Sequence, residues 1–354
     1  MTQRKWWFPL GLILSAVLVL AGVMLMLDSF TMQPDLSSPP GWQIIRPPSD
    51  IHALAEQGNI IWAGGKDGLF QLDLLSGELI AEVIFDPPLE HVRALLVDDQ
   101  GALWVGHQTG LSHYKDGVWQ TYTQEDGLPD NRVNALMLDD AGYLWVGTWG
   151  GAAIRDGGGW RLLTQADGLL DDMVNVMLQD RHGGIWFGSY VAPRGGISYL
   201  KDGDWQYFDT DNGLPHNNVT SLVETNDGYI WAGTGLFDRG GTCQFAFSEA
   251  GWQIAQVLIR EDGLAGEKVR SIFQDNAGVL WFGSEYDGVA LLSGDTWFIL
   301  DMSDGISHPE IKTILQDVDG NIWLGTRDGL TRISVEALMI LYNRLTSYLI
   351  VLRM

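Results

Sequence analysis

The side chains best suited to chemistry in this sequence are three histidines in similar surroundings. His216 and His308 each stand three residues after a glycine, in the segments DNGLPHNN and DGISHPE, and His91 precedes a similar apolar segment. A histidine held beside a carboxylate can act as a general base. Three such residues brought to one place would support a lyase or a glycosidase, which we keep as the less favoured alternative.

The chain lacks the sequence patterns that hold metals, phosphates or redox cofactors. None of its seven histidines forms a His-x-x-x-His pair, and no Gly-x-x-x-x-Gly-Lys segment is present. Cys243 is the only cysteine, so neither an intrachain disulfide nor a thiol pair for a metal can form. The turns DDAG, TNDG and DVDG lack the acidic ladder of calcium loops. We predict hairpin turns at these positions, no metal, no cofactor and no catalysis.

The charge of the chain excludes two kinds of partner. The sequence carries 45 acidic and 21 basic residues, for a formal net charge of −24. A surface that binds nucleic acid needs clustered lysine and arginine, and so does a basic patch that binds anionic lipid. We expect neither, and we expect most of the carboxylates to lie on a solvated surface.

A Trp-x-Gly triplet recurs through most of the chain and decides the fold class. Successive copies are separated by 42, 41, 41, 45, 50 and 42 residues. A period of this length with several short strands is typical of one blade of a β-propeller. Because a ligand contact is rarely needed seven times, we expect these tryptophans to fill the cores of the blades. They are Trp62, Trp104, Trp145, Trp186, Trp231, Trp281 and Trp323.

One repeat shows the strands of a blade. Between Asn131 and Leu170 the sequence reads NRVNALMLDDAGYLWVGTWGGAAIRDGGGWRLLTQADGLL. Apolar residues alternate with others at its start, and turns rich in aspartate and glycine then separate three further short strands. Four strands in each of seven repeats predict an all-β, seven-bladed β-propeller over residues 41–334.

The two ends of the ring are expected to share a blade. Five repeats carry a second tryptophan 15 to 21 residues after the first, but none follows Trp323. Trp42, in GWQIIRPPSD, stands before the first repeat and resembles the fourth-strand segment WQTYTQEDG. We predict that the N-terminal strand Trp42 to Arg46 completes the seventh blade and removes a free sheet edge. Leu79 to Ile84 would be the fourth strand of the first blade.

The segments that join the repeats resemble a known family. DGLPDNRVNALMLDDAGYLWVGTWGG, DGLPHNNVTSLVETNDGYIWAGT and DGISHPEIKTILQDVDGNIWLGT are similar to the two-component regulator propeller repeat, and the resemblance extends over about Gly41 to Ser334. It implies the extracytoplasmic sensor region of a membrane protein, as found in hybrid histidine kinases, without catalysis of its own. We expect no kinase domain after Ser334, so that output would pass through a partner.

An uncharged segment precedes the repeats. Trp6 to Leu27 would span about 33 Å as a helix rising ~1.5 Å per residue, which is enough for the hydrocarbon core of a bilayer. Arg4 and Lys5 precede it and Asp28 follows it, so the positive-inside rule predicts a cytoplasmic N-terminus. We predict one transmembrane helix that anchors the chain in the cell membrane; a cleaved signal peptide is the alternative.

The remaining boundaries follow from composition. Residues 1–28 would form the cytoplasmic N-terminus and anchor, 29–40 a polar linker, and 41–334 the propeller outside the cytoplasm. Residues 335–354 are apolar but contain Asn343 and Arg344, which makes a second membrane span poor. We expect a helix there, packed on the propeller or on the membrane surface.

The loops at the mouth of the central channel are the default ligand surface of a propeller. Two loops of each blade reach that face, one between its second and third strands and one leading into the next blade. Trp149 breaks the repeat and is our first candidate for a contact, and insertions at Tyr190–Arg194 and Leu236–Arg239 occupy the same point of the next two repeats. The predicted ligand-binding residues are His91, Asn131, Arg132, Trp149, Tyr190, Arg194, His216, Asn217, Phe237, Arg239, Lys268 and His308.

The sequence therefore predicts a membrane-anchored propeller that senses or binds a ligand in a two-component-type signalling context. The ligand would be a carbohydrate, a peptide or a metabolite, because the aromatic and carboxylate content of the chain favours none of the three. The main alternative is a scaffold that binds a signalling partner protein.

Overall fold

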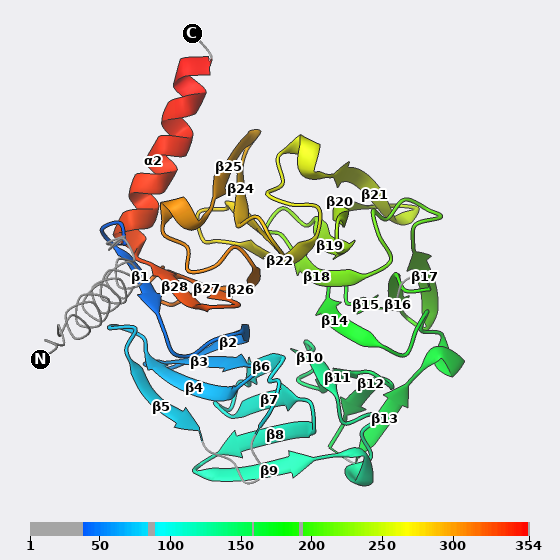
Figure 1. Cartoon of the computed structure of the whole chain (residues 1–354). Helices are drawn as coiled ribbons and strands as arrows, with labels where there is room; N and C mark the ends of the chain where they lie inside the picture. Colours follow the sequence, from blue (N-terminus) through cyan, green and yellow to red (C-terminus); the bar gives the residue numbers. More distant parts are fainter. Residues whose placement is uncertain (1–37, 84–88, 158, 191–193, 353–354) are drawn as a thin grey trace, which may run out of the picture. The chain divides into compact units, whose positions relative to one another are not determined.

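The computed structural model describes residues 38–83, 89–157, 159–190 and 194–352. In this part of the chain 28 strands form seven four-stranded antiparallel sheets, which are arranged in a ring (Figure 1). Each sheet is one blade, and its first strand contacts the first strand of the next blade all the way round. The all-β, seven-bladed propeller predicted from the repeat is confirmed.

Blades one to four follow one another along the chain. Blade one consists of β2 (Ile51–Gln57), β3 (Ile60–Gly65), β4 (Gly68–Asp73) and β5 (Leu79–Val83). Blade two consists of β6 (Ala94–Val97), β7 (Leu103–His107), β8 (Gly110–Lys115) and β9 (Val118–Tyr122). Blade three consists of β10 (Val133–Leu138), β11 (Leu144–Thr148), β12 (Gly151–Arg155) and β13 (Trp160–Leu163). Blade four consists of β14 (Val174–Gln179), β15 (Ile185–Ser189), β16 (Ile197–Lys201) and β17 (Asp204–Phe208).

Blades five to seven complete the ring. Blade five consists of β18 (Val219–Glu224), β19 (Ile230–Leu236), β20 (Arg239–Ser248) and β21 (Gly251–Leu258). Blade six consists of β22 (Val269–Gln274), β23 (Leu280–Ser284), β24 (Val289–Ser293) and β25 (Thr296–Leu300). Blade seven consists of β26 (Ile311–Gln316), β27 (Ile322–Thr326), β28 (Gly329–Ile333) and β1 (Trp42–Ile45).

The N-terminal strand β1 closes the ring as the outer strand of blade seven. It pairs antiparallel with β28, with Trp42 opposite Ile333 and Ile45 opposite Leu330. It thus fills the place left by the fourth strand that does not follow Trp323. β5 is the outer strand of blade one, as expected from the segment that begins at Leu79.

The tryptophans of the Trp-x-Gly triplets form the centres of the blade cores. All seven are buried, with no more than 8% of any of them exposed. Burying ~150–250 Å² of aromatic surface is worth about 4–6 kcal/mol at ~25 cal/mol/Å², as an upper estimate. The repeat therefore places a large apolar contribution at the same point of every blade.

A hydrogen bond to an aspartate fixes the position of the indole in five blades. The indole N–H of Trp145 donates to Asp139 Oδ2 at 2.8 Å, and Trp104, Trp186, Trp281 and Trp323 donate to Asp98, Asp180, Asp275 and Asp317 at 2.8–2.9 Å. The other oxygen of Asp139 accepts the main-chain N–H groups of Ala141 and Tyr143 at 3.0 and 2.8 Å. One side chain thus holds both the hairpin turn between strands one and two and the core tryptophan.

Two blades replace this aspartate. In blade one Gln57 Oε1 accepts the hydrogen bond from the Trp62 indole at 2.8 Å. In blade five Thr225 occupies the position, and its hydroxyl donates to the Tyr229 carbonyl at 3.0 Å, across the turn. The segments DDAG, TNDG and DVDG are therefore the hairpin turns that the sequence predicts.

The glycine of each triplet brings neighbouring blades together. A Cβ atom on Gly147 would lie 2.8 Å from Val174 Cγ1 of blade four, and one on Gly325 would lie 2.9 Å from Ile51 Cγ2 of blade one. These contacts are shorter than side chains tolerate. Only glycine lets the β-branched residue at the start of the next blade pack this closely, and the same contact recurs at the seam of the ring.

Helix α2 (Val335–Leu352) follows β28 and packs on blades six and seven. Ala337, Leu338 and Leu341 are buried in the same apolar cluster as Leu300 of β25. The Tyr342 hydroxyl donates a hydrogen bond to Asp275 Oδ2, the oxygen that also accepts from the Trp281 indole. Burial and the Asp275 carboxylate raise the pKa of Tyr342. The helix expected after the repeats is present.

Trp6 to Leu27, predicted to span the bilayer, lies outside the described residues. Within the described ranges no helix is both long and apolar enough to cross a membrane.

Replacing Asp139 by alanine should destabilise the propeller, because the Trp145 indole and two turn amides lose their acceptor. Leaving a buried donor without a partner costs ~1–3 kcal/mol, so we expect the free energy of unfolding in urea to fall by about 2 kcal/mol. Asp140→Ala changes the exposed neighbouring carboxylate and should have an effect below ~0.5 kcal/mol. Equal unfolding free energies for the two variants would show that the hydrogen bonds of Asp139 do not stabilise the blade.

His107 should make the propeller sensitive to mild acid. It stands at the end of β7, is 1% exposed, and its ring contacts Thr109 Oγ1 at 3.0 Å and Ser112 Oγ at 2.9 Å. Burial lowers the pKa of His107 to about 4. The unfolded state therefore takes up this proton at a higher pH than the folded state, and the stability that the neutral ring provides is lost as the pH falls from about 6.5 toward 4.

We expect this group to account for about 2 kcal/mol of the unfolding free energy lost between pH 7 and pH 5. The loss is measured by urea titration at both pH values for the wild type and for His107→Gln, which keeps a side chain that can hydrogen bond. The variant should lose correspondingly less stability between the two pH values. The same pH dependence in both proteins would contradict the assignment.

Candidate functional site

The central channel of the propeller contains a cavity of about 430 Å³, which we call the channel cavity. Its volume lies within the ~300–1,000 Å³ typical of ligand pockets. The lining residues are His52, Arg93, Asn134, Trp149, Asn175, Tyr190, Thr220, Arg270, Glu310 and Lys312.

Seven of these residues come from the same position in the seven blades, directly after the β-branched residue that begins the innermost strand segment. At the junction of blades two and three, for example, Val133 packs on Gly106, and Asn134 is the next residue. At the following junction Val174 of blade four packs on Gly147 of blade three in the same way. In six blades the pairing of strands one and two shifts register at this residue, as between Val133 and Ala135. The contact that joins the blades therefore also sets the residue that lines the channel.

The lining residues divide into two arcs of opposite character. Blades six, seven, one and two supply the basic arc, which consists of Arg270, Lys312, His52 and Arg93. Blades three, four and five supply the neutral arc, which consists of Asn134, Asn175 and Thr220.

The neutral arc is hydrogen bonded from blade to blade. Asn134 Nδ2 donates to the Val174 carbonyl at 3.3 Å, and Asn175 Nδ2 donates to the Val219 carbonyl at 2.9 Å. The Thr220 hydroxyl donates to the carbonyl of Val269 in the same way. The donor groups of these side chains are therefore already hydrogen bonded to the neighbouring blade. The Oδ1 atom of Asn134 has no hydrogen-bond partner.

Charges of alternating sign cross the basic arc. Arg270 lies 3.8 Å from Glu285 and 3.5 Å from Glu310. Lys312 lies 3.6 Å from Glu310 and also forms a salt bridge with Asp50. Arg270 and Lys312 thus each lie between two carboxylates, which compensate their charges.

The row continues at both ends. Lys268, which is 4% exposed, forms a salt bridge of 2.5 Å with Glu285. At the other end His52 Nε2 lies 3.7 Å from Asp50 Oδ1. Burial lowers the pKa of His52, and the Asp50 carboxylate acts in the opposite direction.

Arg93 is the exception in the basic arc. Among the residues that the structure describes, no carboxylate lies within salt-bridge distance of its guanidinium. Its Cζ atom lies 6.0 Å from the centre of the Trp149 ring. Burial and the nearby charge of Arg270 lower the pKa of Arg93, but an arginine keeps its charge under all ordinary conditions.

Trp149 is held at the edge of the cavity by blade three itself. The guanidinium of Arg132 stacks over its ring, with Cζ 4.2 Å from the ring centre. Asp130 fixes Arg132 through two hydrogen bonds of 2.8 and 2.7 Å. The indole is therefore positioned in advance beside Arg93.

The structure places four of the residues predicted to bind ligand at or beside the channel cavity. Trp149 and Tyr190 line it directly. Arg132 stacks on Trp149, and the ammonium group of Lys268 lies 5.9 Å from the centre of the Tyr190 ring.

The other predicted residues do not line the channel cavity. Asn131 and Asn217 accept main-chain N–H bonds from Gln124 and Thr210 at 2.8 Å, which organises the loops before β10 and β18. His216 and His308 each accept a main-chain N–H bond at Nδ1 from the residue two positions later, at 2.9 and 3.0 Å. Of the remaining four residues, His91 is partly buried, and Arg194, Phe237 and Arg239 are exposed.

Sequence reasoning missed most of the ring that lines the channel. The signal was present, because a β-branched residue followed by a residue that varies in charge stands at the start of each innermost strand or, in blade two, just before it. These segments read IHAL, VRAL, VNAL, VNVM, VTSL, VRSI and IKTI. Alternation alone shows that such residues leave the blade core, but not that they face the channel.

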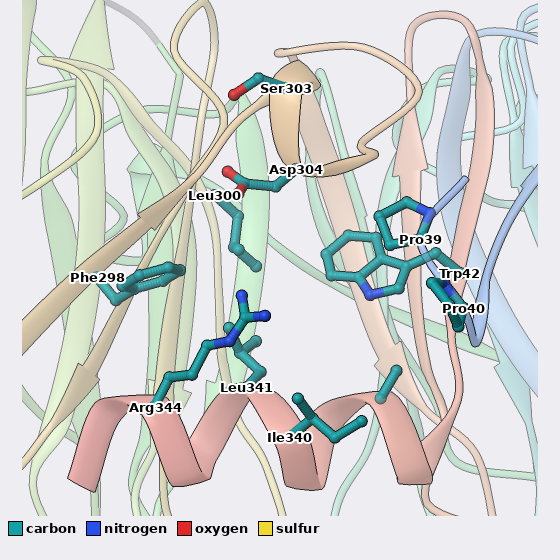
Figure 2. Close-up of a pocket in the computed structure, with 11 residues that line it drawn as sticks. Pro39, Pro40, Trp42, Phe298, Leu300, Ser303, Asp304, Ile340, Leu341 and Arg344 are labelled. Atoms are coloured by element: carbon teal, nitrogen blue, oxygen red, sulfur yellow. The ribbon is translucent and has the colours of Figure 1, made fainter. Parts of the chain in front are cut away.

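A second cavity, of about 460 Å³, lies between α2 and the outer strands of blades six and seven. Figure 2 shows Leu341 and Arg344 directed into it from α2, with Phe298 and Trp42 on its flanks. Its walls are the apolar surfaces against which the helix packs. We assign this cavity to the seam of the fold, because few polar groups converge on it.

Comparison with known proteins identifies the repeat. The family described as Two component regulator propeller matches residues 127–150, 168–191, 213–235, 263–286 and 305–328. The chain carries two component regulator propeller repeats. Each match runs from the loop before the innermost strand through the second strand, so it includes the channel-lining residue of blades three to seven. No curated protein matches the chain in sequence.

Solved structures show the same fold at low sequence identity. Two from B. thetaiotaomicron, described as extracellular domains of hybrid two component systems, have 20% and 19% identity and TM-scores of 0.73 and 0.66, and cover 85% and 83% of this chain. The chain spans only 42% and 39% of their lengths. A catalytically inactive virginiamycin B lyase from Staphylococcus aureus, with quinupristin, has 14% identity and a TM-score of 0.64, over 83% of this chain and 99% of the lyase.

Proposed function

We propose that this chain is the recognition module of a membrane signalling system and binds its ligand in the channel cavity. The two component regulator propeller repeats support the signalling context. The likeness to domains described as extracellular parts of hybrid two component systems supports a position outside the cytoplasm. The uncharged segment Trp6 to Leu27 would anchor the chain in the cell membrane.

The observation that carries the proposal is the departure from repeat symmetry at the channel. The blade framework is the same seven times, but the lining residues change from blade to blade. Among the described lining residues, Trp149 and Tyr190 supply aromatic surface from two adjacent blades. A ring with an aromatic wall, a basic arc and a hydrogen-bonded neutral arc can orient a small asymmetric ligand.

Catalysis by His91, His216 and His308 finds no support in their geometry. His91, His216 and His308 would have to converge on the channel, and in the described part of the chain none of the three lines its cavity. His216 and His308 instead have their Nδ1 atoms engaged by main-chain amides. The resemblance to virginiamycin B lyase is one of fold.

Ligand binding is tested by thermal unfolding of the full chain in detergent micelles against glycans, peptides and small metabolites. A ligand at a hundredfold excess over its dissociation constant stabilises the native state by about 2.7 kcal/mol, which raises the unfolding midpoint. Trp149→Ala should remove this shift. The control is Tyr143→Ala, which removes an exposed aromatic side chain at the opposite end of blade three and should leave the shift unchanged.

Two outcomes would count against the proposal. A shift that survives Trp149→Ala would place the ligand outside the channel cavity. A chain that unfolds cooperatively, responds to no small molecule and is stabilised by another membrane or extracytoplasmic protein would be a scaffold.

A further inference from the structure

The charges in and beside the channel cavity do not cancel. Arg270, Lys312 and Lys268 each form ion pairs with one or more carboxylates. These carboxylates are three in number: Glu285, Glu310 and Asp50. Arg93 adds a fourth cation that has no carboxylate partner among the described side chains. Four cations against three carboxylates leave a net charge of +1, in a chain whose formal net charge is −24.

An uncompensated guanidinium is a costly feature to keep in a partly enclosed channel. Arg93 is only partly exposed, and the positive charge of Arg270 in the same arc repels it. Burying a charge without a partner is unfavourable, so such a group is stabilised when an anion enters. A surface lysine or arginine would not show this, because water and salt screen it.

The surroundings of Arg93 fit the flat face of a ligand next to its charged end. The centre of the Trp149 ring lies 6.0 Å from Arg93 Cζ, and the indole is held in place by Arg132. Tyr190 contributes a second aromatic side chain to the same cavity. Asn134 is 8% exposed, and its Oδ1 atom is without a hydrogen-bond partner.

We propose that the channel cavity binds the carboxylate of a small organic acid, paired with Arg93, with the body of the ligand against Trp149. This rests on the proposed function and adds the chemical class of its ligand. The guanidinium presents parallel N–H groups that match the two oxygens of a carboxylate. The cavity of about 430 Å³ limits the ligand to a small molecule or to the end of a longer one.

The same charge balance argues against the other ligand classes. A phosphate monoester, which is doubly charged at neutral pH, would bring one negative charge more than the cavity compensates, and Asp50 and Glu310 would repel it. A neutral ligand would displace water from Arg93 without supplying a charge in return. A single negative charge is the best match.

The test compares acids with their primary amides, which keep the shape and lose the charge. The probes are benzoate, phenylacetate, indole-3-acetate, galacturonate and N-acetylphenylalanine, each beside its amide, with inorganic phosphate and sulfate as further arms. Binding to the full chain is measured by thermal shift and by isothermal titration calorimetry. We expect at least one acid to bind and its amide to bind at least about tenfold more weakly.

Variants assign the binding to Arg93. Arg93→Gln should raise the dissociation constant of the acid at least about tenfold, and Arg93→Lys should have an intermediate effect because it keeps the charge without the paired N–H groups. Arg161→Gln removes the same charge from an exposed position on β13 and should leave binding unchanged. The unfolding midpoints without ligand report whether each variant folds.

The proposal is overturned if acid and amide bind equally well, if Arg93→Gln binds the acid like the wild type, if phosphate or sulfate binds more tightly, or if no acid binds. These failures are distinct from failure of the proposed function. A neutral glycan or peptide whose stabilising effect depends on Trp149 would support ligand binding in the channel cavity and contradict the recognition of a carboxylate. The absence of any ligand whose binding depends on Trp149 would contradict both the proposed function and the recognition of a carboxylate.

Discussion

The hydrogen bond from the core tryptophan to the aspartate of the preceding turn is the interaction on which the rest of this propeller depends. It fixes the indole inside the blade, and with it the glycine two residues later. That glycine leaves room for the β-branched residue that begins the next blade, and the residue after it faces the channel. This bond recurs in five of the seven blades, so a local interaction repeated along the chain helps to set which side chains a ligand would meet.

Much of the fold follows from the sequence, because a period in the sequence reports a period in the structure. The spacing of Trp-x-Gly fixed the number of blades, and the isolated Trp42 indicated which strand closes the ring. The double role of Asp139 could not be predicted, because Asp-Asp-Ala-Gly is also an ordinary turn. The local pattern does not show that the carboxylate accepts a hydrogen bond from a tryptophan six residues later.

The site was less predictable than the fold, for a related reason. Trp149 stood out because it interrupts the repeat, whereas Arg93 and Asn134 sit inside it and look like any polar residue of an alternating strand. The register shift at this position turns Asn134 to the channel, and Arg93 lines the channel at the equivalent position just before β6. Whether a cation there is already paired depends on carboxylates of other blades, as with Glu310 between Arg270 and Lys312, and no single repeat contains that information.

A crystal structure of the propeller bound to its most stabilising ligand tests the central claim, recognition inside the ring, most directly. The account predicts ligand density in the channel cavity, against Trp149, with an acidic group within hydrogen-bond distance of the Arg93 guanidinium. Density beside α2 or on the outer strands, with only water between Arg93 and the neutral arc, would contradict it.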